Sequence, residues 1–174
     1  MFVTETWNDP KSPKIHYING YQSAFANGKT GKGKGVGVFY KCAAQIEVCE
    51  EDLFQFIKLM NQRATIFCVY VSKGCNFAQL VQTLTDYGFN KEKENTFLVG
   101  DLNFDSPGNN DLSKYLKRLE FKQIVGRATH LDGHILDHVY VSEKNASMVH
   151  IHHHYVYYSD HDGILVSLRK DEIE

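Results

Sequence analysis

The sequence has little proline, no excess of positive charge, no CxxC cysteine pair and no apolar run long enough to cross a membrane. With 3 prolines and 43% hydrophobic residues, its composition is typical of a globular protein rather than a disordered one. The net charge of −2 gives no support to nucleic-acid binding, although a divalent metal site would itself need acidic residues. The length of 174 residues and the absence of an internal repeat predict a single domain, 1–174.

The four cysteines are Cys42, Cys49, Cys68 and Cys75, and three of them lie in or beside strand-like segments. This pattern predicts buried free thiols in a reducing compartment and argues against a zinc site. Because no signal peptide is recognisable, we expect a cytoplasmic or nuclear protein that does not contact a membrane.

The most informative stretch runs from Val99 to Asp105 and follows a short apolar run that is typical of a buried strand. Gly100 marks a place where the chain turns or admits a close neighbour. Asp101 and Asn103 are two residues apart, so on an extended backbone their side chains face the same side. Strand ends of this kind carry the chemistry of many α/β sheets, whereas a simple Asx turn is the structural alternative.

Apolar patterns predict several strands and two amphipathic helices. The helices are expected at 77–87 and 111–119, and residues 53–60 fit either a helical turn or an irregular strand. Strands are expected at 2–7, 36–41, 45–49, 65–71, 96–99, 135–142, 149–158 and 164–168. Their irregular order predicts an α+β fold of packed sheets covered by helices.

Two further patterns invite a ligand-binding interpretation. The Gly- and Lys-rich segment 28–35 is not a Walker loop, because Ser23 occupies the position of the first glycine. It fits a basic hairpin connection in which Lys29, Lys32 and Lys34 could touch a phosphate backbone. The alternating His150, His152 and His154 would share one strand face, as a transition-metal site or as an exposed surface.

Acidic side chains recur on, or at the ends of, the predicted apolar strands. Such oxygen ligands suit Mg²⁺ or Mn²⁺ rather than zinc, and a histidine beside an acid supplies a proton relay or an oriented imidazolium. The residues concerned are Glu5, Asp101, Asp137 and Asp160, together with Asn103 and His161.

The order of six short motifs resembles the endonuclease–exonuclease–phosphatase superfamily, which includes exonuclease III, deoxyribonuclease I and the endonucleases of non-LTR retrotransposons. The similarity is nearest to mobile-element endonucleases. It implies a four-layer α/β/β/α sandwich of two mainly antiparallel sheets flanked by helices. The motifs are Thr4–Trp7, Gly35–Phe39, Val69–Ser72, Gly100–Asn103, Leu136–Ser142 and Ser159–Asp162.

The resemblance also implies roles for individual residues. Glu5 matches the metal-binding glutamate, and Asp160 is a second metal or water ligand. Asp101 and Asn103 match the pair that positions the attacking water and the scissile phosphate.

Three further residues complete the expected site. Tyr70 falls where the family has a tyrosine that contacts phosphate. Asp137 matches the acid that orients the catalytic histidine, and His161 matches that histidine.

The sequence departs from the family at its start, because Glu5 follows Met1 so closely that the usual preceding strand, with an asparagine of the metal site, is missing. We therefore expect an N-terminally shortened sandwich, which another chain or module could complete.

The predicted function is hydrolysis of phosphodiesters, as a DNA endonuclease dependent on Mg²⁺ or Mn²⁺. The alternatives are a phosphatase of the same superfamily and a catalytically impaired remnant that acts as a binding module.

Overall fold

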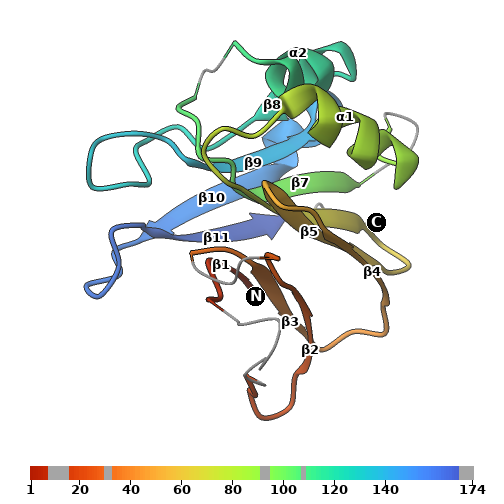
Figure 1. The fold of residues 1–174 in the computed structure, drawn as a ribbon, viewed down its shortest axis with the longest axis vertical. Coiled ribbons are helices and arrows are strands. Elements are labelled where there is room, and N and C mark those ends of the chain that lie inside the picture. Colours follow the sequence, from red (N-terminus) through yellow and green to blue (C-terminus); the bar gives the residue numbers. More distant parts are fainter. Residues whose placement is uncertain (8–15, 30–32, 91–94, 107–108, 169–174) are drawn as a thin grey trace.

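A six-stranded sheet forms the middle layer of the computed structural model, which describes residues 1–7, 16–29, 33–90, 95–106 and 109–168 (Figure 1). In spatial order the strands are β4 (Gln45–Glu50), β5 (Phe54–Met60), β6 (Thr65–Val71), β7 (Thr96–Asp101), β9 (Asp137–Ser142) and β8 (Phe121–Gln123). Among the described strands of this sheet, only β6 and β7 pair in parallel, and a helix connects them; the other neighbours are antiparallel.

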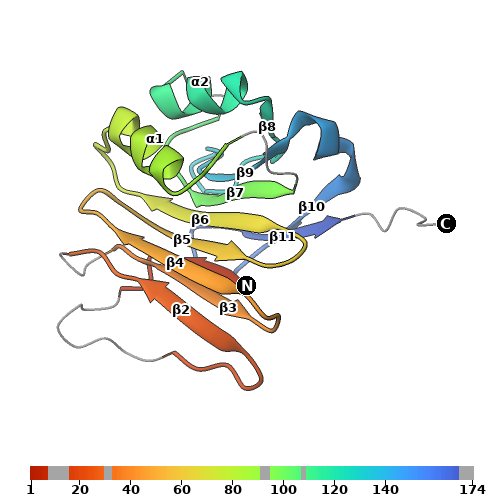
Figure 2. The ribbon, with the colours of Figure 1, turned by 90° about the vertical axis from the view of Figure 1, so that its right-hand side faces the viewer.

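Two helices, α1 (Phe77–Asp86) and α2 (Asp111–Arg118), cover one face of this sheet (Figure 2). Both begin with an asparagine cap. The Asn76 side chain accepts hydrogen bonds from two backbone N–H groups of α1, and Asn110 forms a reciprocal capping box with Ser113. The leucines of the helices and the phenylalanines of the sheet form the largest apolar core.

Two smaller sheets pack on the opposite face. The first has the order β1–β3–β2, with β1 at Phe2–Thr4, β2 at Gln22–Ala26 and β3 at Val36–Tyr40. The second is the hairpin of β10 (Val149–His154) and β11 (Gly163–Leu168), which the 3-10 helix η1 (Glu143–Met148) precedes. Each small sheet shares its own apolar cluster with the central sheet.

The predicted fold of packed, mainly antiparallel sheets with helices is confirmed (Figure 2). Within the described parts of the chain, the helices lie on one side only, so the layers are helices, the central sheet and the two small sheets. None of the described helices has the length and apolar character that crossing a membrane requires.

Several predicted element boundaries need correction. The strand expected over residues 2–7 ends at Thr4, because Glu5 has a positive φ of 52° that breaks the extended geometry. The 53–60 segment is the regular strand β5, which is paired on both sides. The strand expected over 149–158 stops at His154, and the short elements β8 and η1 were not predicted.

The four cysteines are free, as predicted, but Cys42 is exposed rather than buried. The alternating histidines His150, His152 and His154 lie on an exposed strand face. The 28–35 segment connects the hairpin β2–β3, and its described lysines pair locally: Lys29 with Glu51, and Lys34 with the Asp52 carbonyl. Lys32 and the predicted 8–14 loop lie outside the described residues.

Strand alternation puts three predicted site residues on the face toward the small sheets. In β6, Val69 packs into the helix-side core, whereas Tyr70 packs into the cluster with β2 and β3. In β7, Val99 faces the small sheets, so Asp101, two residues on, shares that face. Asp137 opens β9 directly opposite Asp101 in the antiparallel register.

At Gly100, β7 lies so close to β6 that a side chain has no room. Its φ is +137°, and a Cβ atom built at this position would lie 1.9 Å from the backbone oxygen of Val69. The sequence predicted a turn or a close neighbour at Gly100. The close neighbour is confirmed, because β7 continues through Gly100 to Asp101.

We expect Gly100→Ala to lower the free energy of unfolding by more than about 2 kcal/mol, because the new methyl group collides with fixed backbone. The matched control is Gly126→Ala, where no atom lies within 4 Å of the added Cβ. This control should stay within about 1 kcal/mol of wild type. Urea unfolding followed by circular dichroism measures both, and equal stability of the two variants would contradict the assignment.

Candidate active site

The strongest interaction in the site is the pair of Asp137 and His161. His161 Nδ1 lies 2.7 Å from Asp137 Oδ2, and both side chains are mostly buried. The hydrogen bond to Asp137 raises the pKa of His161 to about 9, so the imidazole is charged at neutral pH. Because Nδ1–H donates to Asp137, the second ring proton of the charged imidazole is on Nε2, which this hydrogen bond does not use.

Thr129 holds the two elements of this pair together. Its hydroxyl accepts hydrogen bonds from the backbone N–H groups of Leu136 and Asp137, which fixes the start of β9. Its backbone oxygen accepts from the Asp162 N–H, one residue after His161. The loop before β9 is therefore tied to the loop between β10 and β11, and the Asp137–His161 pair lies where they meet.

Asp101 is a buried acid beside another acid. Its relative exposure is 2%, and Asp137 is its register partner on β9. Burial, followed by the charge of Asp137, raises the pKa of Asp101 to about 7, against the lowering effect of the Asn103 N–H group and of His161. An acid with this pKa can take up a proton near neutral pH.

Asn103 is bound to Asp101 through both its backbone and its side chain. The Asn103 N–H donates to Asp101 Oδ1 at 2.9 Å, and its carboxamide nitrogen lies 3.3 Å from Asp101 Oδ2. The same nitrogen donates to the Val71 carbonyl at 2.9 Å. The turn, which has a φ of 51° at Asn103, orients the Asp101 carboxylate.

Tyr70 connects the central sheet to the segment after β1. Its hydroxyl lies 2.7 Å from the Gly33 carbonyl and 3.2 Å from Glu5 Oε1. One hydroxyl hydrogen can serve only one of these acceptors at a time, so the contact with Glu5 can be exchanged for another ligand. Burial and the charge of Glu5 raise the pKa of Tyr70, so the hydroxyl remains a neutral donor.

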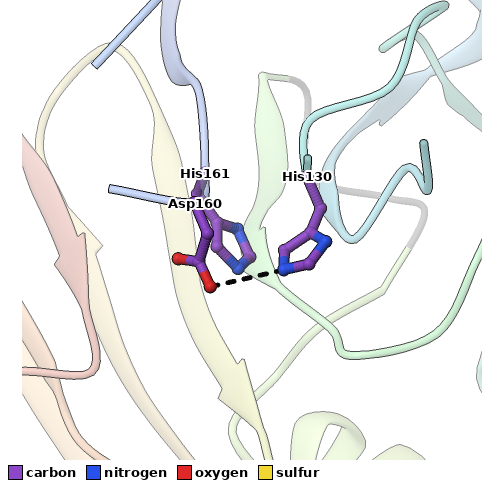
Figure 3. Close-up of side chains that lie close together, drawn as sticks. All are labelled: His130, Asp160 and His161. Carbon is purple, nitrogen blue, oxygen red and sulfur yellow. Dashed lines mark ion pairs between the residues drawn. The ribbon is translucent and has the colours of Figure 1, made fainter. Parts of the chain in front are cut away.

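The described residues include one group of histidine and acid side chains that could hold a metal ion, namely His130, Asp160 and His161 (Figure 3). Asp160, which was predicted as a metal ligand, pairs with His130: Asp160 Oδ2 lies 3.4 Å from His130 Nε2. His130 was not assigned a role from sequence, because its contact with His161 depends on a bridge between two distant loops.

His138 follows Asp137 in the sequence but faces the opposite side of the sheet. It is 1% exposed, and its Nε2 lies 3.0 Å from the Phe104 carbonyl and 2.9 Å from the Ile135 carbonyl. Burial lowers its pKa, so this histidine stays neutral. Its contacts support the loop that carries Asn103, and it has no access to the site.

The acidic groups around Asp101 suit a divalent cation. The charges that act on Asp101 come from the carboxylates of Asp137 and Glu5 and from the imidazolium of His161. These are three carboxylates against one imidazolium, and oxygen donors are the ligands that Mg²⁺ and Mn²⁺ prefer. The chemistry of these donors therefore fits the predicted metal, whereas Asp160 lies beside His130.

No protein-family model matches the sequence, and no curated protein matches it either. Solved structures do resemble the fold. The endonuclease domain of TRAS1, a telomere-specific non-LTR retrotransposon, superposes with a TM-score of 0.61 at 13% identity, covering 87% of this chain and 80% of that domain. The Haemophilus ducreyi cytolethal distending toxin gives 0.62 at 13% identity, covering 97% and 84%.

A third neighbour is an endonuclease/exonuclease/phosphatase family protein from Leptotrichia buccalis. Its TM-score is 0.53 at 16% identity, and the match covers 88% of this chain and 73% of that one. The fold of packed sheets with helices thus has solved counterparts, and the likeness at this level of identity establishes the fold alone.

The raised pKa of His161 generates a prediction that needs no substrate. Asp137→Asn removes the main cause of the shift, so the pKa of His161 should fall from about 9 toward the ordinary histidine range. A histidine-selective NMR titration measures this change. The stabilisation that the pair gives the fold is complete below the ordinary pKa of histidine and is lost as the pH rises through about 9.

The control for this titration is Asp105→Asn. Asp105 pairs with His134 at 3.0 Å in an exposed loop, so its replacement should leave the His161 curve unchanged. If His161 titrates in the ordinary range in the wild-type protein, the inferred hydrogen bond to Asp137 is absent.

Proposed function

We propose that this chain, which has the fold of the endonuclease/exonuclease/phosphatase superfamily, is a divalent-metal-dependent phosphodiester hydrolase that cuts DNA. The observation that carries the proposal is the convergence of the Asp137–His161 pair with the buried Asp101 on one face of the central sheet. The fold shared with nuclease domains supports it, since this arrangement is placed on a scaffold that such enzymes use.

In the proposed reaction, a water oxygen bonds to phosphorus while the ester P–O bond breaks. Asp101, whose pKa of about 7 suits a general base, takes the proton of the water, and Asn103 holds the Asp101 carboxylate in place. His161 donates its Nε2 proton to the phosphate or to the departing oxygen, while Asp137 fixes the ring. Tyr70 exchanges its contact with Glu5 for a phosphate oxygen.

Glu5 is the ligand that we propose for Mg²⁺ or Mn²⁺, because it belongs to the carboxylate cluster around Asp101. A divalent ion held there would neutralise charge on the phosphate, with water and phosphate oxygens filling its other positions. Asp160 contributes less to this ion in our proposal, since its side chain is exposed and paired with His130.

Exposed aromatic rings beside the site favour a polynucleotide over a small phosphoester. Tyr155, Tyr157 and Tyr158 lie on the loop that leads to His161, and each is at least 75% exposed. Tyr155 and the equally exposed Leu131 border a pocket of about 240 Å³ that also contains His161. Aromatic faces of this kind stack on nucleobases, which a small phosphoester does not offer.

A partner strand remains part of the proposal. Among the described strands, β1 pairs only with β3, so its other edge can accept a strand from another chain or module. Such a strand would run beside Glu5, where the resemblance expects an asparagine of the metal site.

The central test is nicking of supercoiled plasmid in Mg²⁺ or Mn²⁺. We expect the wild type to nick, and His161→Gln and Asp101→Asn each to lower the rate by at least about 100-fold, as for the loss of a general acid or base. The matched control is His152→Gln on the exposed face of β10, which should keep wild-type activity.

The other outcomes separate the alternatives. Release of inorganic phosphate from small esters without nicking would favour a phosphatase. A folded wild-type protein that is silent with both substrates would contradict hydrolysis by this chain and favour a binding module.

The tyrosines give a second prediction. Replacing Tyr157 and Tyr158 together by alanine should weaken binding of a single-stranded oligonucleotide by about 1–3 kcal/mol, the cost of one lost base stack, without unfolding the protein. Fluorescence anisotropy in EDTA measures binding without cleavage. Tyr17→Ala is the control, because Tyr17 is similarly exposed but lies before β2 and not on the loop that leads to His161. Equal losses in both variants would argue against stacking at the site.

A further inference from the structure

The outer side of His161 faces a second histidine and an acid. His130 Nε2 lies 3.4 Å from Asp160 Oδ2, and the rings of His130 and His161 are edge to face with centroids 4.9 Å apart (Figure 3). One ligand atom from each of His130, Asp160 and His161 falls within 4.8 Å of the others. All three residues line the pocket of about 240 Å³, so an ion can reach them from solvent.

The backbone holds these side chains in place. His130 and His161 are opposite each other in an isolated antiparallel bridge, and the Leu131 N–H donates to the Asp160 carbonyl at 3.0 Å. The site is therefore formed by two segments that an antiparallel bridge holds side by side, rather than by neighbours on a single loop. Little rearrangement is needed to bring two imidazoles and a carboxylate onto one ion.

The hydrogen bond of the His161 ring favours metal binding through Nε2, whereas the His130 ring must change tautomer to bind in the same way. His161 Nδ1–H donates to Asp137 at 2.7 Å, the carboxylate–histidine arrangement that orients metal-binding histidines. His130 Nδ1 accepts a hydrogen bond from the Asp132 N–H at 3.1 Å and lies 3.5 Å from the Asp132 carboxylate. When His130 Nε2 binds a metal, the ring proton moves to Nδ1, and the Asp132 carboxylate can accept it.

We propose that His130, Asp160 and His161 form a site for Zn²⁺ or a similar transition-metal ion, separate from the Mg²⁺ ligands, and that metal bound there inhibits the enzyme. Two imidazole nitrogens, one carboxylate oxygen and a water make up a common tetrahedral zinc site. The 3.4 Å separation of the His130 and Asp160 ligand atoms is close to the edge of a tetrahedron with bonds of about 2.0–2.1 Å.

Inhibition follows because His161 Nε2 would bind the zinc ion and is also the proton donor of the proposed reaction. The inhibitory part of the proposal rests on the proposed function, in which His161 Nε2 donates a proton to the phosphate. A zinc ion on that nitrogen displaces the proton and occupies the face that the phosphate must approach. Zinc binding and catalysis then exclude each other, while Glu5 remains available for Mg²⁺.

Binding is tested first and without substrate. Co²⁺ titrated into the wild-type protein should produce the visible absorption of a tetrahedral site, and Zn²⁺ should displace it. Calorimetry with Zn²⁺ should give one tight site that His130→Asn weakens by more than about tenfold, since it removes a ligand itself rather than a group that orients a ligand. The matched control is His134→Asn, in the same loop but paired with Asp105, which should bind zinc as the wild type does.

Equal zinc affinity in His130→Asn and wild type would overturn the site, whatever the enzymatic activity. Circular dichroism shows whether the variant is folded. Asp160→Asn, which keeps the shape of the side chain, provides a second variant that should also weaken binding.

Inhibition is tested by plasmid nicking in excess Mg²⁺. Micromolar Zn²⁺ should stop nicking by the wild type, and a chelator selective for zinc should restore it. His130→Asn should nick like the wild type without zinc but need a more than about tenfold higher zinc concentration for inhibition. Unchanged zinc sensitivity in this variant would overturn the regulatory role, whereas absence of nicking in zinc-free wild type would overturn the proposed function but not the metal site.

Discussion

The placement of Asp101 opposite Asp137 in the β7–β9 register is the constraint on which the rest of the site depends. Two carboxylates at adjacent strand ends repel each other, and burial of Asp101 makes this repulsion more costly. The fold compensates by placing His161 against Asp137 and the Asn103 N–H against Asp101. The remaining negative charge, which includes Glu5, is what a divalent ion would neutralise. Without a cation, the carboxylates of the site outnumber its one imidazolium. This excess of negative charge is the physical basis of the proposed metal dependence.

The arrangement of the site restricts which residue the central sheet can have at position 100. Gly100 leaves no room for a side chain, because the Val69 carbonyl occupies the space that a Cβ would take. The close approach holds β7 against β6, so that Tyr70 and Asp101 end on the same side of the sheet. The helix-side core on the other face is built from Leu and Phe side chains and contributes no polar group to the site. Stability and chemistry thus lie on opposite faces of the same strands, a separation that the two-residue period of β-structure provides.

Much of this could be predicted from sequence, since apolar runs and leucine spacing mark the buried strands and both helices. Asp101 and Asn103 do lie together, but through the Asx turn with a φ of 51° at Asn103, which was the structural alternative, rather than through an extended backbone. Other features depend on contacts between distant segments, which local patterns do not encode. Glu5 was expected within a strand, but its positive φ ends β1 at Thr4. The strand expected to reach Tyr158 ends at His154, because its aromatic residues belong to an exposed loop rather than to a sheet. His130 became relevant only through its bridge to His161.

His161 shows how one side chain can serve structure and chemistry through different atoms. Its Nδ1 is committed to Asp137, which fixes the ring and keeps it charged. Its Nε2 faces the pocket, where the neighbouring His130 and Asp160 offer further metal-binding atoms. The same carboxylate that prepares the imidazole to donate a proton also prepares it, once deprotonated, to bind a transition metal, because both roles need Nδ1–H held in place. Under the two proposals, a site arranged for proton transfer is therefore also open to inhibition by zinc, and the position of His130 sets how tightly zinc binds.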